Sequence, residues 1–118
     1  MWFAVGFNAG QMRDQPYTLI ANASGVTEQK LGTCGSEADH CPGTPLAPTA
    51  TLVSNDVSGG TRTVVLTRAL SIASADYYSF SPASLTVELI SAIGSSQVFA
   101  YVSPSALVAL RSAGVGTV

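Results

Sequence analysis

The sequence predicts an all-β protein whose strands form an antiparallel sandwich or barrel. Six short segments are rich in β-branched or aromatic residues and are bounded by Gly, Pro, Asn or Ser. Two of these segments alternate in the way that is typical of half-buried strands. An apolar stripe with helical spacing occurs only at Ala106–Leu110. The 118 residues, with a mass of 12.0 kDa, fit a single domain, 1–118.

The expected strands follow in chain order. They are Trp2–Phe7, Tyr17–Ala21, Thr49–Asn55, Arg62–Arg68, Ser84–Ser91 and Gln97–Val102. Alternation is clearest in the fourth and fifth segments, where Val64 and Leu66 share one face, as do Leu85, Val87 and Leu89. The third and fourth segments are joined by a stretch that contains Gly59-Gly60. Because glycine readily adopts positive φ, we expect these two strands to form an antiparallel hairpin.

The two ends of the chain leave alternatives open. Ala106–Leu110 follows Ser103-Pro104, which could cap and start one helical turn, but the same residues could equally form a last strand. The chain opens directly on a strand pattern without the basic segment of a secretory signal. We therefore expect it to be part of a longer protein.

Charge and hydropathy exclude several function classes. Charged residues make up 10% of the chain, and five Lys+Arg against seven Asp+Glu give a net charge of −2. The basic residues are scattered, whereas nucleic-acid binding requires a basic cluster or stripe. No apolar run approaches the length of about 18 residues that could cross a bilayer. We expect neither a nucleic-acid partner nor a membrane span.

The cysteines Cys34 and Cys41 are the only ones in the chain and lie in a stretch rich in Gly, Pro, Ser and Asp, where we expect a surface loop. Our preferred interpretation is a local disulfide, worth about 2.5 kcal/mol for so short a loop. The alternative is a metal site formed with Asp39 and His40, although the paired spacings of structural zinc are missing. A disulfide, like the acceptor triplet Asn22-Ala23-Ser24, favours an extracellular or lumenal location.

The sequence contains no recognisable arrangement of catalytic residues, and we expect the protein not to be an enzyme. His40 has Asp39 beside it, but neighbouring residues on an extended chain point apart, and no serine in a strand-to-helix turn accompanies them. The acidic residues are spread out, so a carboxylate pair for glycoside hydrolysis is not indicated. Gly59-Gly60 lacks the Lys and the helix of a phosphate-binding loop.

The order of several local patterns resembles the DOMON domain. The similar segments are Trp2–Phe7, Met12, Tyr17–Ala21, Arg62–Leu70, Ile90–Ser95 and Phe99–Tyr101, which together cover most of the chain. The resemblance implies an immunoglobulin-like β-sandwich, found in extracellular proteins, that binds haem b or sugars. It also implies that the family's first strands are missing, so that another segment, domain or chain would cover the exposed edge, and that residues 29–48 form a loop insertion carrying the cysteines.

A haem site is the first implication for function. In the haem-binding branch the iron is held by a Met after the Gly-Phe strand and by a His near the last strand. Met12 stands at the first of these positions, and Val102, which cannot ligate iron, stands at the second. We therefore expect a degenerate site and no cofactor. The alternatives are a b-type cytochrome domain, in which Met12 and an unidentified ligand hold haem b, and Met12 as core filler.

Carbohydrate binding by a non-catalytic module is our leading hypothesis, and a structural or adhesive surface module is a further alternative. Tyr77 and Tyr78 lie in an expected loop, where exposed rings can stack on sugars or merely cap the sandwich. Trp2 could also stack on a ligand, although an aromatic in such a strand usually packs in the core. Arg62 and Arg68 share one strand face, and could contact an anionic ligand or act as solvated strand ends.

Overall fold

The computed structural model describes the backbone of residues 1–34, 38–81, 83, 86–94 and 107–114, and the side chains of these residues except those in 33–42 and 107–114. The described elements are β1 (Trp2–Phe7), η1 (Met12–Asp14), β2 (Tyr17–Asn22), β3 (Gly25–Cys34), β4 (Ala38–Pro45), β5 (Ala50–Ser58), β6 (Thr61–Arg68), β7 (Thr86–Gly94) and β8 (Leu107–Gly114). The 3-10 turn η1 is the only helical element among them, so the protein is all-β, as the sequence predicts.

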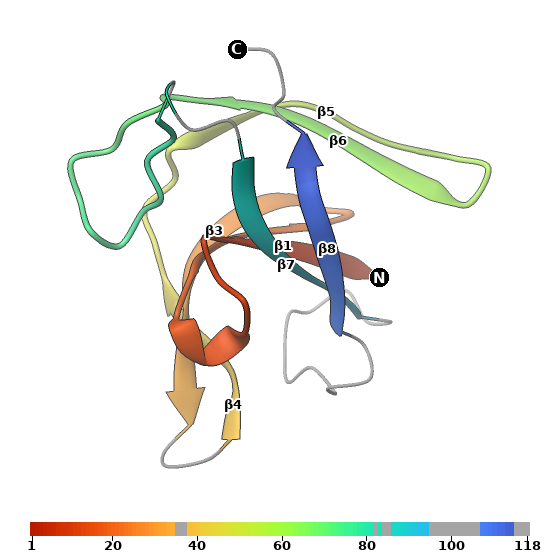
Figure 1. Ribbon diagram of the computed structural model, residues 1–118. Coiled ribbons are helices and arrows are strands. Elements are labelled where there is room, and N and C mark those ends of the chain that lie inside the picture. Colours follow the sequence, from red (N-terminus) through yellow and green to blue (C-terminus); the bar gives the residue numbers. More distant parts are fainter. Residues whose placement is uncertain (35–37, 82, 84–85, 95–106, 115–118) are drawn as a thin grey trace.

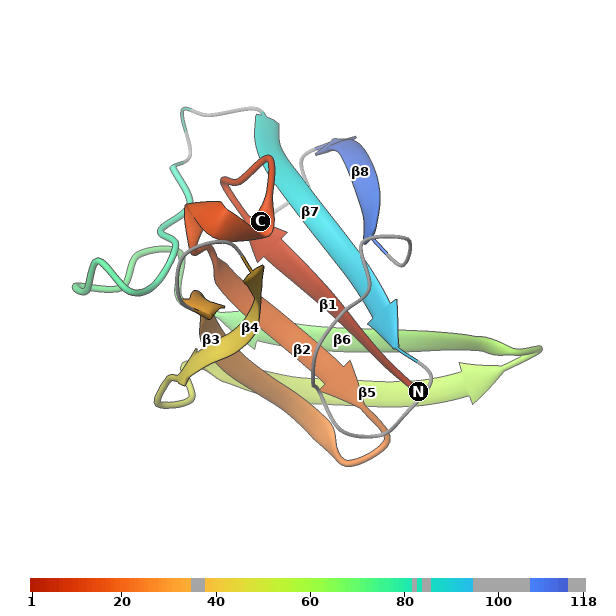
Figure 2. The ribbon, with the colours of Figure 1, turned by 90° about the horizontal axis from the view of Figure 1, so that it is seen from below.

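Six strands form one antiparallel sheet in the order β4-β3-β2-β1-β7-β8. Strand β1 lies at its centre, where Ala4 is opposite Ile20 of β2 on one side and Ala92 of β7 on the other. The sheet grows outward from β1 through sequential hairpins on one side (Figure 2). This arrangement buries alternate residues of β1, because successive side chains of a strand point to opposite faces.

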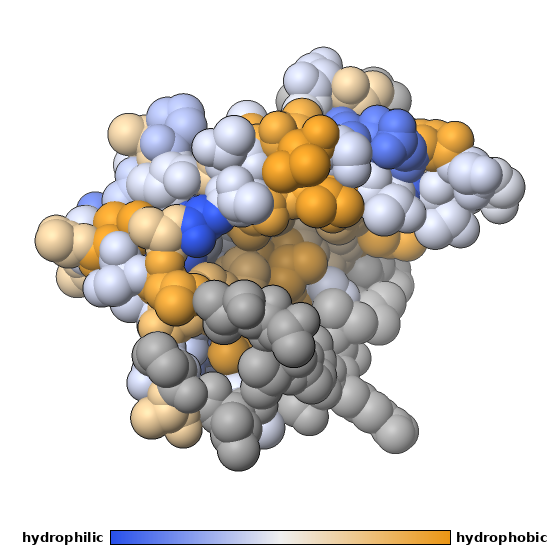
Figure 3. Space-filling model, turned by 90° about the horizontal axis from the view of Figure 1, so that it is seen from above, coloured by the Kyte–Doolittle hydropathy of each residue, from blue (hydrophilic) through white to orange (hydrophobic). Residues whose placement is uncertain are grey.

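Strands β5 and β6 form a separate hairpin that lies across the six-stranded sheet as a second layer (Figure 1). Gly59 and Gly60 both have positive φ, 56° and 79°, as a tight hairpin turn requires. The tip of the hairpin extends past the edge of the larger sheet (Figures 1 and 2). Its outer surface carries a central hydrophobic area (Figure 3), in keeping with the exposure of Val53 and Val65, at 61% and 46%.

Two apolar clusters form the core among the described residues. The first joins Trp2, Ala4, Ile20 and Ala92 from the three central strands. The second is made of Ala9, Met12, Leu31 and Ile90, and it holds the turn η1 against the sheet. Burying an aliphatic side chain of this size contributes about 1.5–3 kcal/mol, so the burial of Met12 holds this turn on the sheet.

The expected strands agree with the structure to different degrees. Four correspond to β1, β2, β5 and β6 within a few residues, and the predicted antiparallel hairpin across Gly59-Gly60 is confirmed. The segment Ser84–Ser91 corresponds to β7, which begins at Thr86. The ambiguous segment Ala106–Leu110 falls mostly in the strand β8. Gln97–Val102 lies outside the described residues, and the immunoglobulin-like strand order stays a prediction.

The prediction that residues 29–48 form a loop is wrong. Most of that segment belongs to the strands β3 and β4, which pair in an antiparallel hairpin with two irregularities in register. Cys34 is opposite Ala38 and Cys41 is opposite Gly32, so the cysteines lie on neighbouring strands but not directly across from each other. Their side chains, and those of Asp39 and His40, lie outside the described ones, so the disulfide and its metal-site alternative stay predictions.

Candidate functional site

Five aromatic rings gather where the ends of β1 and β2 meet the loop that follows β6. Phe7 contacts Tyr17, Tyr78 and Phe80 with ring centroids 5.8, 5.9 and 5.5 Å apart. Its ring is nearly parallel to that of Tyr78, at 10°. Tyr17 in turn lies 5.5 Å from Tyr77. The cluster therefore joins side chains from two strands of the large sheet with a loop that is distant in the sequence.

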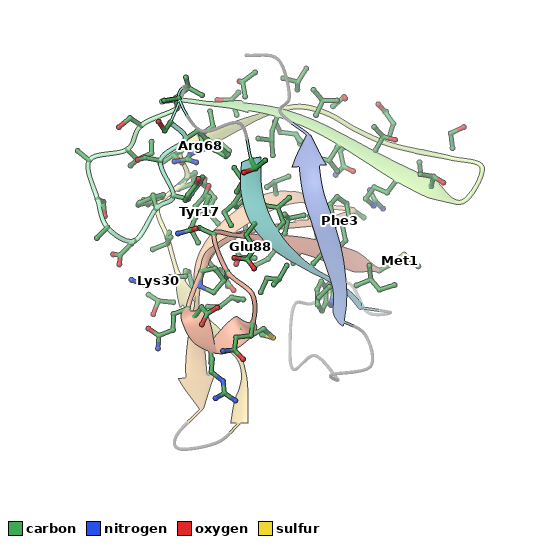
Figure 4. All side chains as sticks on the ribbon, in the orientation of Figure 1. Met1, Phe3, Tyr17, Lys30, Arg68 and Glu88 are labelled. Carbon is green, nitrogen blue, oxygen red and sulfur yellow. The ribbon has the colours of Figure 1, made fainter. Side chains whose placement is uncertain are left out.

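Arg68, the last residue of β6, lies against this cluster. Its guanidinium carbon is 4.8 Å from the ring centroid of Tyr17 and 5.5 Å from that of Phe80. Figure 4 shows Arg68, Tyr17 and Lys30 on the same side of the molecule. One guanidinium nitrogen, Nη2, donates a hydrogen bond to the backbone oxygen of Tyr78. Cation–π attraction and this bond hold the loop to the second layer.

A cleft of about 290 Å³ opens beside the cluster. Four of the five rings line it, those of Phe7, Tyr17, Tyr77 and Tyr78. The polar side chains around them are Asn8, Asp14, Gln15, Lys30 and Asp76. The surface that the cleft exposes is mostly polar, with the rings lying among these polar groups. A concave site where polar groups converge beside aromatic side chains can bind a small molecule.

The loop that forms one wall of the cleft is fixed at several points. Lys30 of β3 forms an ion pair of 3.1 Å with Asp76, and the hydroxyl of Tyr77 donates a hydrogen bond of 2.7 Å to the backbone oxygen of Ala47. Within the loop, the backbone nitrogen of Phe80 donates to the oxygen of Leu70. These bonds hold Tyr77 and Tyr78 in position, although neither residue belongs to a helix or a strand.

The opposite wall carries strained backbone. Asn8 and Gln15 have φ of 57° and 54°, and they are the only non-glycine residues with positive φ in the described part of the chain. Both line the cleft. For glutamine this conformation costs about 1–2 kcal/mol, and such residues tend to occur at functional sites. The carboxylate of Asp14 shapes the same turn, since it accepts hydrogen bonds from the backbone nitrogens of Gly10 and Gln11.

A buried carboxylate anchors the floor of the site. Glu28 is only 4% exposed and accepts bonds from the Tyr17 hydroxyl at 2.5 Å, from the backbone and hydroxyl of Thr49, and from the backbone nitrogen of Ala50. Burial would raise the pKa of Glu28, but these hydrogen bonds outweigh it and hold the pKa below its ordinary value. Burial, and then the bond to Glu28, raises the pKa of Tyr17 far above its usual range.

Of the described residues singled out in the sequence, Tyr77 and Tyr78 line the cleft, whereas Trp2, Met12, Arg62 and Arg68 do not. Trp2 does not lie where a ligand could stack on it: it is 3% exposed and packs in the core against Gly94, as the strand pattern also allowed. Arg62 and Arg68 share the inner face of β6, but Arg62 donates to Asn55 and Arg68 packs on the aromatic cluster. Both side chains are half-buried, and the two interpretations of the pair, contacts to an anionic ligand or solvated strand ends, stay predictions.

The described residues do not fit a haem at Met12. Its side chain is 4% exposed and is enclosed by Ala9, Leu31 and Ile90, so a porphyrin could reach the sulfur only if this cluster opened. Val102, the expected position of the second ligand, lies outside the described residues. Core packing explains the place of Met12 without a cofactor.

The sequence analysis missed most of the cleft's lining residues, among them Phe7, Tyr17, Asn8 and Gln15. The sequence analysis names Phe7 and Tyr17 only as ends of expected strands, and at a strand end a side chain can face a loop. The signal that could have indicated them is an aromatic residue on each side of the polar segment 8–16, which joins the two strands.

Comparison with families of known proteins, with curated proteins and with solved structures gives no match. No helix of the described residues is long and apolar enough to span a membrane. Within the same residues, no group of three or more His, Cys, Asp or Glu could hold a metal ion. Fold and site thus define the class: an all-β protein of two antiparallel layers with an aromatic-lined cleft at one end.

Proposed function

We propose that the chain is a non-catalytic binding module that holds a carbohydrate in the cleft lined by Phe7, Tyr77 and Tyr78, with Tyr17, which is only 4% exposed, supporting these rings from behind. The single observation that carries the proposal is the presence of these rings and the side chains of Asn8 and Gln15 in one cleft. Sugar rings have apolar faces edged with hydroxyl groups, which match aromatic surfaces bordered by amides and carboxylates. The left-handed backbone at Asn8 and Gln15 supports a site that is preorganised at a cost in stability.

Charge around the cleft favours a neutral sugar. The only lysine among its lining residues, Lys30, is paired with Asp76 at 3.1 Å. Asp14 adds a further carboxylate to the wall. An acidic sugar would therefore meet a neutralised cation and an unbalanced negative charge, which disfavours its binding.

The compartment and family form part of the same proposal. The resemblance to DOMON domains, which include sugar-binding members, agrees with a carbohydrate ligand, with an immunoglobulin-like strand order and with an extracellular or lumenal location. Other domains or chains of a larger extracellular protein would be its partners. The cytochrome and adhesive alternatives lack a specific observation in their favour.

A glycan array containing neutral and acidic sugars, followed by titration calorimetry with the best binder, tests the proposal. We expect neutral sugars to bind, Tyr78→Ala to weaken binding about tenfold through loss of one stacking surface, and Tyr78→Phe to retain most of the affinity. Gln15→Gly removes a polar contact but suits the left-handed backbone, so we expect weaker binding with stability that is unchanged or higher. The proposal fails if no sugar binds, or if Tyr77→Ala and Tyr78→Ala leave the affinity unchanged.

A further inference from the structure

We propose that Asn22 is the acceptor of an N-linked oligosaccharide, carried at the tip of the β2–β3 hairpin. Asn22-Ala23-Ser24 is an Asn-X-Ser triplet whose middle residue is not proline. The other asparagines, Asn8 and Asn55, have no Ser or Thr two residues later. The chain therefore offers one acceptor.

The structure places this triplet in an accessible turn. Asn22 pairs with Gly25 at the end of the hairpin, so Ala23 and Ser24 form the turn itself, and both are exposed. The Asn22 side chain bends into the turn, because its Oδ1 accepts a hydrogen bond of 2.8 Å from the backbone nitrogen of Ser24. Oδ1 is not the atom that reacts. An acceptor triplet is expected to lie on such a surface turn.

The transfer uses a lipid diphosphate-linked oligosaccharide as co-reactant. A bond forms between Asn22 Nδ2 and C1 of the first sugar, and the bond between that carbon and the diphosphate oxygen breaks. One amide proton leaves Nδ2, and the lipid diphosphate departs with the electron pair. The product is a neutral glycosylated amide.

The glycan would not obstruct the cleft. Strand β2 begins at Tyr17, which lines the cleft, and ends at Asn22. Five steps of extended backbone separate them by about 17 Å. The inference rests on passage of the chain through a secretory compartment, not on sugar binding in the cleft, so either can fail without the other.

The test is expression of the full chain behind a secretion signal in eukaryotic cells, with intact mass measured on both lumenal and secreted protein. We expect a glycan mass on wild type and on Ser24→Thr, released by peptide N-glycosidase with conversion of Asn22 to aspartate. The variants Asn22→Gln and Ser24→Ala should have the mass of the unmodified chain. We also expect the glycosylated and enzymatically released forms to melt at the same temperature.

Two results would overturn the inference. One is wild-type protein at the unmodified mass in both fractions. The other is a glycan present on retained lumenal protein but missing from secreted protein, since the folded hairpin would then not accommodate it. A chain that is not secreted still tests the inference. Glycan transfer precedes export, so the mass of the lumenal protein shows whether the glycan is attached.

Discussion

At the scale of single residues, the carboxylate of Glu28 is a buried polar group with several hydrogen-bond donors. Its two oxygens accept hydrogen bonds from Tyr17, Thr49 and Ala50, which belong to the large sheet and to the start of the second layer. A buried carboxylate is costly unless it is bonded in this way. Because every partner donates, the site requires an acceptor and not merely a polar side chain.

Replacing this acceptor should therefore destabilise the fold. Glu28→Gln keeps the shape but presents donors to the Tyr17 hydroxyl and to Thr49, so we expect a loss of about 2–3 kcal/mol in the free energy of unfolding at neutral pH. Urea unfolding measures the loss. Glu88→Gln, which alters an exposed carboxylate of β7, is the matched control and should change stability little.

The pH dependence of the same variant follows from the lowered pKa of Glu28. A carboxyl group whose pKa is lower in the folded than in the unfolded chain adds stability above its unfolded value, and this stability is lost as the pH falls toward the folded value. The difference between wild type and Glu28→Gln should therefore shrink below pH 4.5, the ordinary value for glutamate. A difference that stays constant through this range would show that the charge of Glu28 contributes nothing.

At the scale of elements, sequence pattern predicted those strands in which side chains carry the signal. Strand β1 and the hairpin β5–β6 alternate β-branched and aromatic residues with smaller or polar ones, and their bounds were close to correct. Strands β3 and β4 were missed because they contain Gly, Glu, Gln, Lys, Cys and Pro, which favour turns or solvent. Backbone pairing with β2 organises them, and that pairing is not visible in local composition.

The same limit applies to the candidate site. Tyr77 and Tyr78 could be predicted because aromatic residues in a loop are unusual. Phe7 and Tyr17 could not, since a strand pattern does not show what the side chains at the ends of a strand contact. That they meet Tyr78 and Tyr77 depends on where the loop after β6 lies, and several bonds hold this loop, among them those of Arg68 to Tyr78, Tyr77 to Ala47 and Lys30 to Asp76.

The packing of β1 on β7 gives a prediction at this scale. A Cβ atom on Gly94 would lie 2.2 Å from the Trp2 ring, which is 3% exposed and cannot move aside freely. We expect Gly94→Ala to lower the free energy of unfolding by about 1–3 kcal/mol through overpacking. Because Trp2 is the only tryptophan, its fluorescence should shift as well.

Gly10→Ala is the control for Gly94→Ala. Its added Cβ would make an ordinary contact of 3.4 Å with the Glu88 side chain, so stability and fluorescence should stay near those of wild type. Unchanged fluorescence and stability in Gly94→Ala would show that Trp2 does not pack on this strand.

At the scale of the whole molecule, several contacts among the described residues join the two layers. Glu28 binds the start of β5, Asn55 donates a bond of 2.8 Å to the backbone oxygen of Asn22, and Arg68 lies against the aromatic cluster. Most of the hairpin β5–β6 is exposed on its outer face. The aromatic cluster forms a wall of the cleft and also contacts Arg68 of β6, so ligand binding and layer packing share some of the same rings.

Arg68 allows the two parts of this contact, charge and packing, to be separated. Its Nε and Nη1 atoms are buried and have no hydrogen-bond partner among the described groups. Buried donors without acceptors lower stability, whereas the aliphatic stem of Arg68 and its stacking on Tyr17 raise it. Arg68→Ala removes both, and we expect it to lower the free energy of unfolding by about 2–3 kcal/mol. Arg68→Met keeps the volume without the donors, and we expect its free energy of unfolding to stay within about 1 kcal/mol of wild type.

Urea unfolding of both variants measures these changes. If methionine proves as damaging as alanine, the positive charge over Tyr17, not the packing, holds the second layer on the sheet.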